Sequence, residues 1–159
     1  MKRGGTLSSI SGVHHVGLTV RNLEASIAFY ERILGCHVIW ERENESSYLA
    51  DIVGYPSVRI LQAQLRAPNS ELVIELFQYL EPHPLEVSLE PRMIGNPHIC
   101  FVVVGLQGIF DAIVGSGFDP VSRPILIDSG VNAGGLSAYV RDPSGIIIEL
   151  FEPAGDVSA

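Results

Sequence analysis

The chain has 159 residues, of which 47% are hydrophobic and 18% are charged. This size and composition predict one globular domain, or two small modules with a shared core, and exclude extensive disorder. The formal net charge of −8 disfavours nucleic acid as a partner, because its recognition needs a basic surface. Neither a secretory signal nor an apolar run of membrane-spanning length is present, so we expect a cytoplasmic protein without membrane contact.

The first elements predicted are a strand and a helix. From Val13 onward, apolar residues alternate with others, which predicts a strand with His15 on its polar face and His14 on the opposite face. Asn22 can cap a following helix, whose apolar residues recur at helical spacing until Gly35 ends it.

Three further strands are predicted at residues 36–40, 58–65 and 71–80, with a long loop at 41–56 that carries Tyr48. If the turn between the last two strands pairs Arg66 with Glu71, the register sets Gln62 opposite Glu75 on one face. The first half of the chain is thus predicted to run strand, helix, strand, strand, strand.

The second half repeats this plan after a segment that contains four prolines. We expect strands at 98–104, 121–127, 136–140 and 146–151, and a helix that begins at Leu106 and ends before Gly115. Cys36 and Cys100 lack metal-type spacing and lie in apolar segments, which predicts free, buried thiols. The predicted divisions are a tail at 1–9, a first module at 10–80, a linker at 81–97, a second module at 98–153 and a tail at 154–159.

The repeat extends to ionisable residues. The tetrapeptide IELF occurs at 74–77 and again at 148–151, and each copy follows a strand that begins near a histidine. His98 follows His15 by 83 residues, and Glu149 follows Glu75 by 74. The sequence therefore predicts a tandem duplication of a βαβββ unit, an α+β fold in which the two modules pack together or exchange partners between chains.

These four residues have the chemistry of a metal site. A charged side chain within an apolar strand costs several kcal/mol unless it is neutralised. Two imidazoles and two carboxylates suit one divalent ion, Mn, Fe, Co, Ni or Zn, and leave positions open for water or substrate, as in catalytic sites. The other histidines are weaker candidates: His14, His37 and His83.

Three segments, together with the tandem plan, carry a resemblance to a known family: the opening HHVGLTVRNLEASIAFYERILG, the restart PHICFVV and the ending YVRDPSGIIIELFEP. Over residues 12–153 the chain resembles the vicinal oxygen chelate superfamily. That family includes glyoxalase I, methylmalonyl-CoA epimerase, extradiol dioxygenases and antibiotic-resistance proteins. The resemblance implies that mixed sheets with flanking helices form a half-open cup. It also implies that the metal binds a small substrate through two adjacent oxygens. The metal ligands it implies are His15, Glu75, His98 and Glu149.

The resemblance favours a metal-dependent isomerase or lyase, in which Glu75 or Glu149 removes a proton next to a carbonyl. Gln62 and Tyr48 are candidate substrate-pocket residues. Thr19 and Tyr79 stand where glyoxalase I has Arg and Asn to hold glutathione, so glutathione is not expected. The alternatives are a ring-cleaving or related non-haem iron dioxygenase and a non-enzymatic drug- or metabolite-binding protein. A homodimer is expected, and whether one chain or two build the cup stays open.

Overall fold

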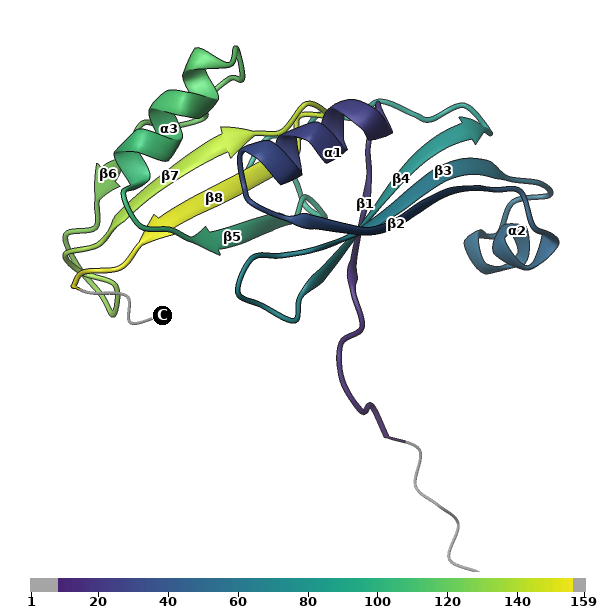
Figure 1. Ribbon diagram of the computed structural model, residues 1–159, viewed down its shortest axis with the longest axis horizontal. Helices are drawn as coiled ribbons and strands as arrows, with labels where there is room; N and C mark the ends of the chain where they lie inside the picture. Colours follow the sequence, from purple (N-terminus) through teal and green to yellow (C-terminus); the bar gives the residue numbers. More distant parts are fainter. Residues whose placement is uncertain (1–8, 156–159) are drawn as a thin grey trace, which may run out of the picture.

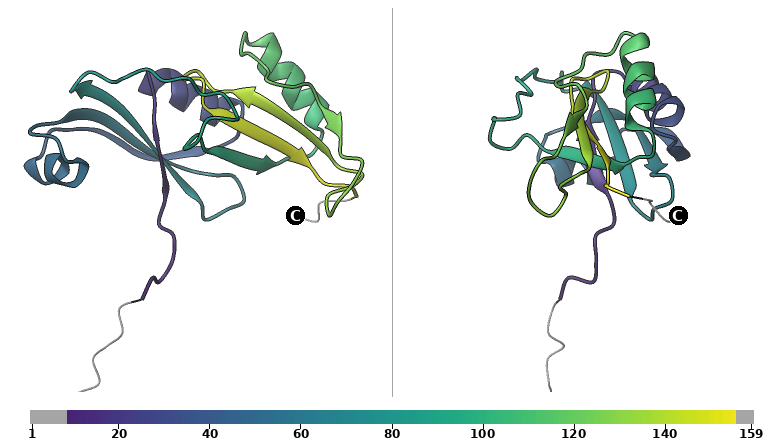
Figure 2. Two further views of the ribbon diagram at one scale, coloured as in Figure 1. Left: turned by 180° about the vertical axis from the view of Figure 1, so that it is seen from behind. Right: turned by 90° about the vertical axis from the view of Figure 1, so that its left-hand side faces the viewer.

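The computed structural model describes residues 9–155, so most of the two predicted tails lies outside the described residues. Two four-stranded mixed sheets lie end to end along the long axis, and helices α1 and α3 lie on the same side of them (Figure 1). The view from behind shows the same succession of sheets (Figure 2). The expected α+β architecture of paired βαβββ modules with open sheets is confirmed.

The first module contains six elements. They are β1 (Val16–Thr19), α1 (Leu23–Arg32), β2 (His37–Asn44), α2 (Ser47–Val53), β3 (Arg59–Arg66) and β4 (Val73–Glu81). The strand order is β1-β4-β3-β2, in which β1 runs parallel to β4 and the other neighbours are antiparallel. As predicted, Asn22 caps α1, since its side-chain oxygen accepts a hydrogen bond of 2.8 Å from the Ala25 amide.

The second module repeats this topology without a counterpart of α2. Its elements are β5 (His98–Val102), α3 (Leu106–Gly115), β6 (Ile125–Leu126), β7 (Leu136–Arg141) and β8 (Ile147–Glu152). The strand order is β5-β8-β7-β6, with β5 parallel to β8. The strand predicted at 121–127 is reduced to the short edge strand β6, which directly follows Pro124, because proline cannot donate a ladder hydrogen bond.

The prediction of a loop at 41–56 is wrong. Strand β2 continues to Asn44, and the seven-residue helix α2 follows and ends at Gly54, which adopts a left-handed φ of 76°. Leu49 and Ala50 of α2 pack with Val58 and other buried residues in a small core cluster. The glycine signal for the helix end is thus present in the sequence, but polar residues around it obscure the helix.

The predicted register between β3 and β4 is also wrong. The backbone pairs Arg66 with Val73, so Gln64 and not Gln62 stands opposite Glu75. The side chains of Arg66 and Glu71 do meet, at 2.5 Å, but the turn between the strands is two residues longer than expected. Because the error is two residues, Gln62 and Gln64 both keep the face on which Glu75 lies.

The two modules share one hydrophobic core. A single cluster of buried residues runs from Leu18 in β1 to Leu150 in β8. Buried residues of α1 belong to this cluster, together with residues of both modules. The rings of Phe29 in α1 and Phe118 after α3 meet edge to face, with centroids 4.8 Å apart. In the described residues, no helix has the length and hydrophobicity needed to span a bilayer.

A buried carboxylate ties the modules together at the turn between β7 and β8. One oxygen of Asp142 accepts hydrogen bonds of 2.8 Å from the amides of Ser144 and Ile146, and the other lies 3.5 Å from the Tyr30 hydroxyl of α1. Burial raises the pKa of Asp142, against the opposing effect of the amide donors. Because its folded-state pKa is raised, stability from this group is greatest at acidic pH and declines as pH rises through that pKa.

We therefore expect Asp142→Asn to be at least as stable as the wild type at neutral pH and to lose no stability from this group as pH rises. An asparagine oxygen still accepts both amide hydrogen bonds. Asp142→Ala leaves them unpaired and should cost about 1–3 kcal/mol. Urea unfolding of both variants from acidic to neutral pH tests this, and equal destabilisation by the two substitutions would contradict it.

Candidate functional site

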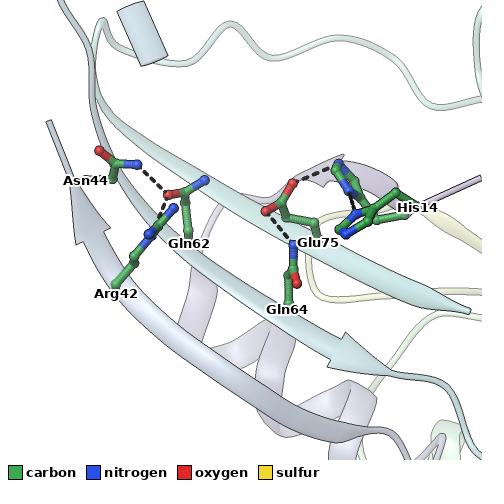
Figure 3. Close-up of polar contacts among 7 residues, drawn as sticks. His14, Arg42, Asn44, Gln62, Gln64 and Glu75 are labelled. Carbon is green, nitrogen blue, oxygen red and sulfur yellow. Dashed lines mark hydrogen bonds and ion pairs between the residues drawn. The ribbon is translucent and has the colours of Figure 1, made fainter. Parts of the chain in front are cut away.

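The first predicted pair, His15 and Glu75, is formed in the structure. Parallel pairing of β1 with β4 sets Gly17 beside Glu75, which brings the preceding His15 over the carboxylate. His15 Nε2 lies 2.9 Å from Glu75 Oε2, and the side-chain amide of Gln64 donates to Glu75 Oε1 at 3.0 Å (Figure 3). The side chain of Glu75 is only 9% exposed and that of His15 is 35% exposed. This carboxylate is therefore fixed, while the imidazole remains accessible.

His14 contacts His15, although the alternation predicted it on the opposite face. The two Nδ1 atoms are 2.8 Å apart and the rings meet edge to face (Figure 3). The prediction fails because β1 begins only at Val16, so the strand alternation does not reach His14. A hydrogen bond on Nδ1 orients the His15 ring with Nε2 toward Glu75, which is how a second residue fixes a metal-binding imidazole.

The second predicted pair, His98 and Glu149, is formed at the equivalent place. His98 Nε2 lies 3.1 Å from Glu149 Oε2. Ser137 donates its hydroxyl to Glu149 Oε1 at 2.9 Å, and the Tyr139 hydroxyl lies 3.5 Å from Oε2. The side chains of His98 and Glu149 are 45% and 21% exposed, so this pair is more open than the first.

The residues that surround Glu149 could not be assigned from the sequence. Tyr139 and Cys100 are its cross-strand neighbours, and Cys100 is exposed, not buried as predicted, whereas Cys36 is buried. Partial burial and the nearby Glu149 raise the pKa of the Cys100 thiol to about 11, so the thiol is neutral at physiological pH. The same two causes raise the pKa of Tyr139. Both groups can therefore donate hydrogen bonds to the carboxylate.

Each pair has the spacing of two neighbouring ligands on one ion. Nitrogen and oxygen ligands lie about 2.0–2.2 Å from a divalent ion such as zinc, so two of them at a right angle are about 3 Å apart. The separations of 2.9 and 3.1 Å in the two pairs fit this arrangement. Within residues 9–155, however, no three His, Cys, Asp or Glu side chains come together to hold an ion. The described part of one chain thus forms two separate His–Glu pairs, and the four residues do not converge within it.

The two predicted pocket residues belong to one polar cluster beside the first pair. Gln62 is 4% exposed, and its side-chain oxygen accepts hydrogen bonds from Arg42 at 3.3 Å and from Asn44 at 2.9 Å (Figure 3). Tyr48 is exposed, and its hydroxyl lies 3.4 Å from the Asn44 amide. Arg42 and Asn44 are site candidates that the sequence did not indicate.

The remaining predicted candidates lie away from the pairs. His37 begins β2 and is exposed. His83 lines a cavity of about 320 Å³ together with Thr19, Tyr55 and Tyr79, which places it next to the two positions compared with glyoxalase I. Neither histidine belongs to a cluster of metal-ligand type in the described part of the chain.

The sequence matches a known family over most of its length. Residues 12–150 match the Glyoxalase/Bleomycin resistance protein/Dioxygenase superfamily. Among curated proteins, the chain is 29% identical over 145 residues to the uncharacterized protein YwkD of Bacillus subtilis, a match that covers 90% of this chain and 98% of YwkD.

Solved structures show the same fold. A glyoxalase family protein from Bacillus cereus superposes with a TM-score of 0.83 at 19% identity, over 96% of this chain and all of that one. A mutant of glyoxalase I from Zea mays superposes with a TM-score of 0.64 at 17% identity, over 89% of this chain and 45% of that one. This likeness in fold extends across both modules.

Proposed function

Because the chain belongs to the glyoxalase/bleomycin resistance protein/dioxygenase superfamily, we propose that it is a divalent-metal-dependent isomerase or lyase acting on a small substrate with adjacent oxygens. Members of this superfamily typically bind a divalent metal and small molecules. The observation that carries the proposal is the pair of equivalent His–Glu contacts, His15 with Glu75 and His98 with Glu149. A set of two imidazoles and two carboxylates suits Mn, Fe, Co, Ni or Zn.

The complete site requires a homodimer in which the first pair of one copy meets the second pair of the other. A two-fold axis would then create two equivalent sites from the four half-sites. The absence of a third ligand near either pair in residues 9–155 supports this arrangement. So does the exposed apolar surface on the face of the second pair, which includes Val102 at 58% and Ile125 at 49% exposed. Side chains of this kind are buried when two copies associate.

The two glutamates are suited to different roles. Glu75 is nearly buried and is held by the Gln64 amide, which suits a fixed ligand. Glu149 is more exposed and is surrounded by the hydroxyls of Ser137 and Tyr139, which suits a base that accepts and returns a proton. A bound divalent ion would supply Lewis-acid stabilisation of the negative charge that develops on the substrate oxygens. Glu149 would take the proton from the carbon next to the carbonyl.

We expect Glu149→Gln to lower the rate of proton exchange by about 10²–10⁴-fold, the usual contribution of a positioned base. A glutamine oxygen can still bind a metal, so metal content should fall much less than the rate. The measurement is deuterium incorporation from D₂O into 2-oxo acids, hydroxyketones and thioesters, followed by NMR after loading with each candidate metal. Ser137→Ala, which removes only one donor to Glu149, is the graded control and should have a smaller effect.

A dioxygenase would give the opposite pattern in the same assays. Iron(II)-loaded protein that consumes oxygen with catechols, while it exchanges no substrate proton with any metal, would overturn the isomerase or lyase assignment. Deuterium exchange without oxygen uptake is the expected result.

A further inference from the structure

The polar cluster of Arg42, Asn44, Gln62 and Tyr48 lies on the same face of the first sheet as Glu75 (Figure 3). Its position follows from a bulge in β2 between Val38 and Trp40. Val38 pairs with Leu65 in the core, but after the bulge Trp40 pairs with Gln64 and Arg42 with Gln62. The extra residue moves Trp40 and Arg42 onto the face of the metal half-site.

Arg42 is held in place without being neutralised. Its Nε donates to the buried Gln62 oxygen at 3.3 Å, and its guanidinium carbon lies 4.8 Å from the centre of the Trp40 ring. The same Gln62 oxygen accepts from Asn44, which fixes the amide. Within residues 9–155, no carboxylate forms an ion pair with Arg42, whereas nearby Arg59 is paired with Glu43. The terminal nitrogens of Arg42 thus remain available for an external anion.

Tyr48 adds a phenol hydroxyl to this polar cluster. The short helix α2 places its hydroxyl beside Asn44. Hydrogen bonds from Asn44 and Ser46, and then the positive charge of Arg42, lower the pKa of the Tyr48 phenol. The positive charge of Arg42 therefore acts at the position of the exposed Tyr48 phenol.

We propose, on the basis of the function proposed above, that Arg42 binds a carboxylate of the substrate at the end opposite to its two chelating oxygens. A guanidinium presents paired N–H donors that match a carboxylate. The one positive charge of Arg42 balances one negative charge, which favours a carboxylate over a phosphate. Arg42 lies two strands away from Glu75 across the sheet, a distance of about 10 Å, and two residues farther along the strand direction, a distance of about 7 Å. The substrate class is thus an oxygenated carboxylic acid with several carbons between its two ends.

The test compares 2-oxo dicarboxylic acids of five and six carbons, 2-oxoglutarate and 2-oxoadipate, with 2-oxo monocarboxylic acids of equal length. Binding is measured by titration calorimetry on metal-loaded and metal-free protein. We expect the wild type to bind the dicarboxylic acids about tenfold or more tightly than the monocarboxylic acids, the value of one charged hydrogen-bonded contact. Arg42→Gln should remove this preference while it leaves metal content and monocarboxylate binding unchanged.

Arg59→Gln is the matched control, because it removes an arginine of the same sheet whose charge is already paired with Glu43. It should retain the dicarboxylate preference. A wild type without that preference, or an Arg42→Gln variant that keeps it, would overturn the role of Arg42 and leave the metal chemistry standing. Failure of the wild type to bind any metal would overturn the proposed function, while titration of metal-free protein would still report on Arg42.

Discussion

Glu75→Ala is expected to lower the affinity of the protein for its divalent metal by more than about 100-fold, since loss of groups that only support a ligand already costs 10–100-fold. Glu75 is the most buried of the four predicted ligands, and its carboxylate is oriented by both His15 and Gln64. Within residues 9–155, no third His, Cys, Asp or Glu side chain joins His15 and Glu75 in a group that could hold an ion. Metal content after dialysis, and calorimetric titration with zinc or manganese, measure the effect.

Glu71→Ala provides the matched control. Glu71 precedes the same strand and forms an exposed ion pair with Arg66, so its removal changes the net charge by the same amount without touching the half-site. This variant should bind metal as the wild type does. Equal metal affinity for Glu75→Ala and the wild type, with both proteins folded by circular dichroism, would remove Glu75 from the site.

Strand alternation explains why the face shared with Glu75 could be predicted, although the ligand role of the four residues stays a prediction. Side chains two residues apart share a face, so an error of two in the register left Gln62 and Gln64 on the face of Glu75. The duplicated spacing of His15 and His98 relative to the two IELF segments then identified matching positions in both modules. The pairing of each histidine with its glutamate follows from parallel strands β1 with β4 and β5 with β8.

Features that depend on a change of register could not be predicted in this way. The bulge after Val38 reverses which residues of β2 face the site, and nothing in HVIWEREN marks it, so Arg42 and Asn44 were missed. Ser137 and Tyr139 are neighbours of Glu149 because of the register between β7 and β8, which the sequence does not indicate. His14 was misplaced because it lies just before β1 begins.

The relation between the two half-sites is a matter of quaternary structure. Each pair forms from residues of one module, and the core that joins the modules through Phe29 and Phe118 does not bring the pairs into one cluster. In the two-fold dimer that we propose, the first pair of one copy would meet the second pair of the other. Two substitutions that each break one pair should therefore affect metal binding differently, depending on whether they lie in the same chain or in different chains.

Heterodimers with two different affinity tags test this directly. One heterodimer joins a Glu75→Ala chain to a Glu149→Ala chain. Its two broken pairs fall in one site and its two intact pairs fall in the other, so it should bind about half the metal of the wild-type dimer. A dimer of wild type with the double variant Glu75→Ala/Glu149→Ala has the same number of substitutions. Every site between its chains contains one broken pair, so it should bind almost none.

The decisive measurement is the tightly bound metal per purified heterodimer in these two combinations. If each site forms between two chains, the first combination binds about one ion and the second binds none. The reverse result, no ion in the first and one in the second, would show that each site forms within a single chain and would contradict the account.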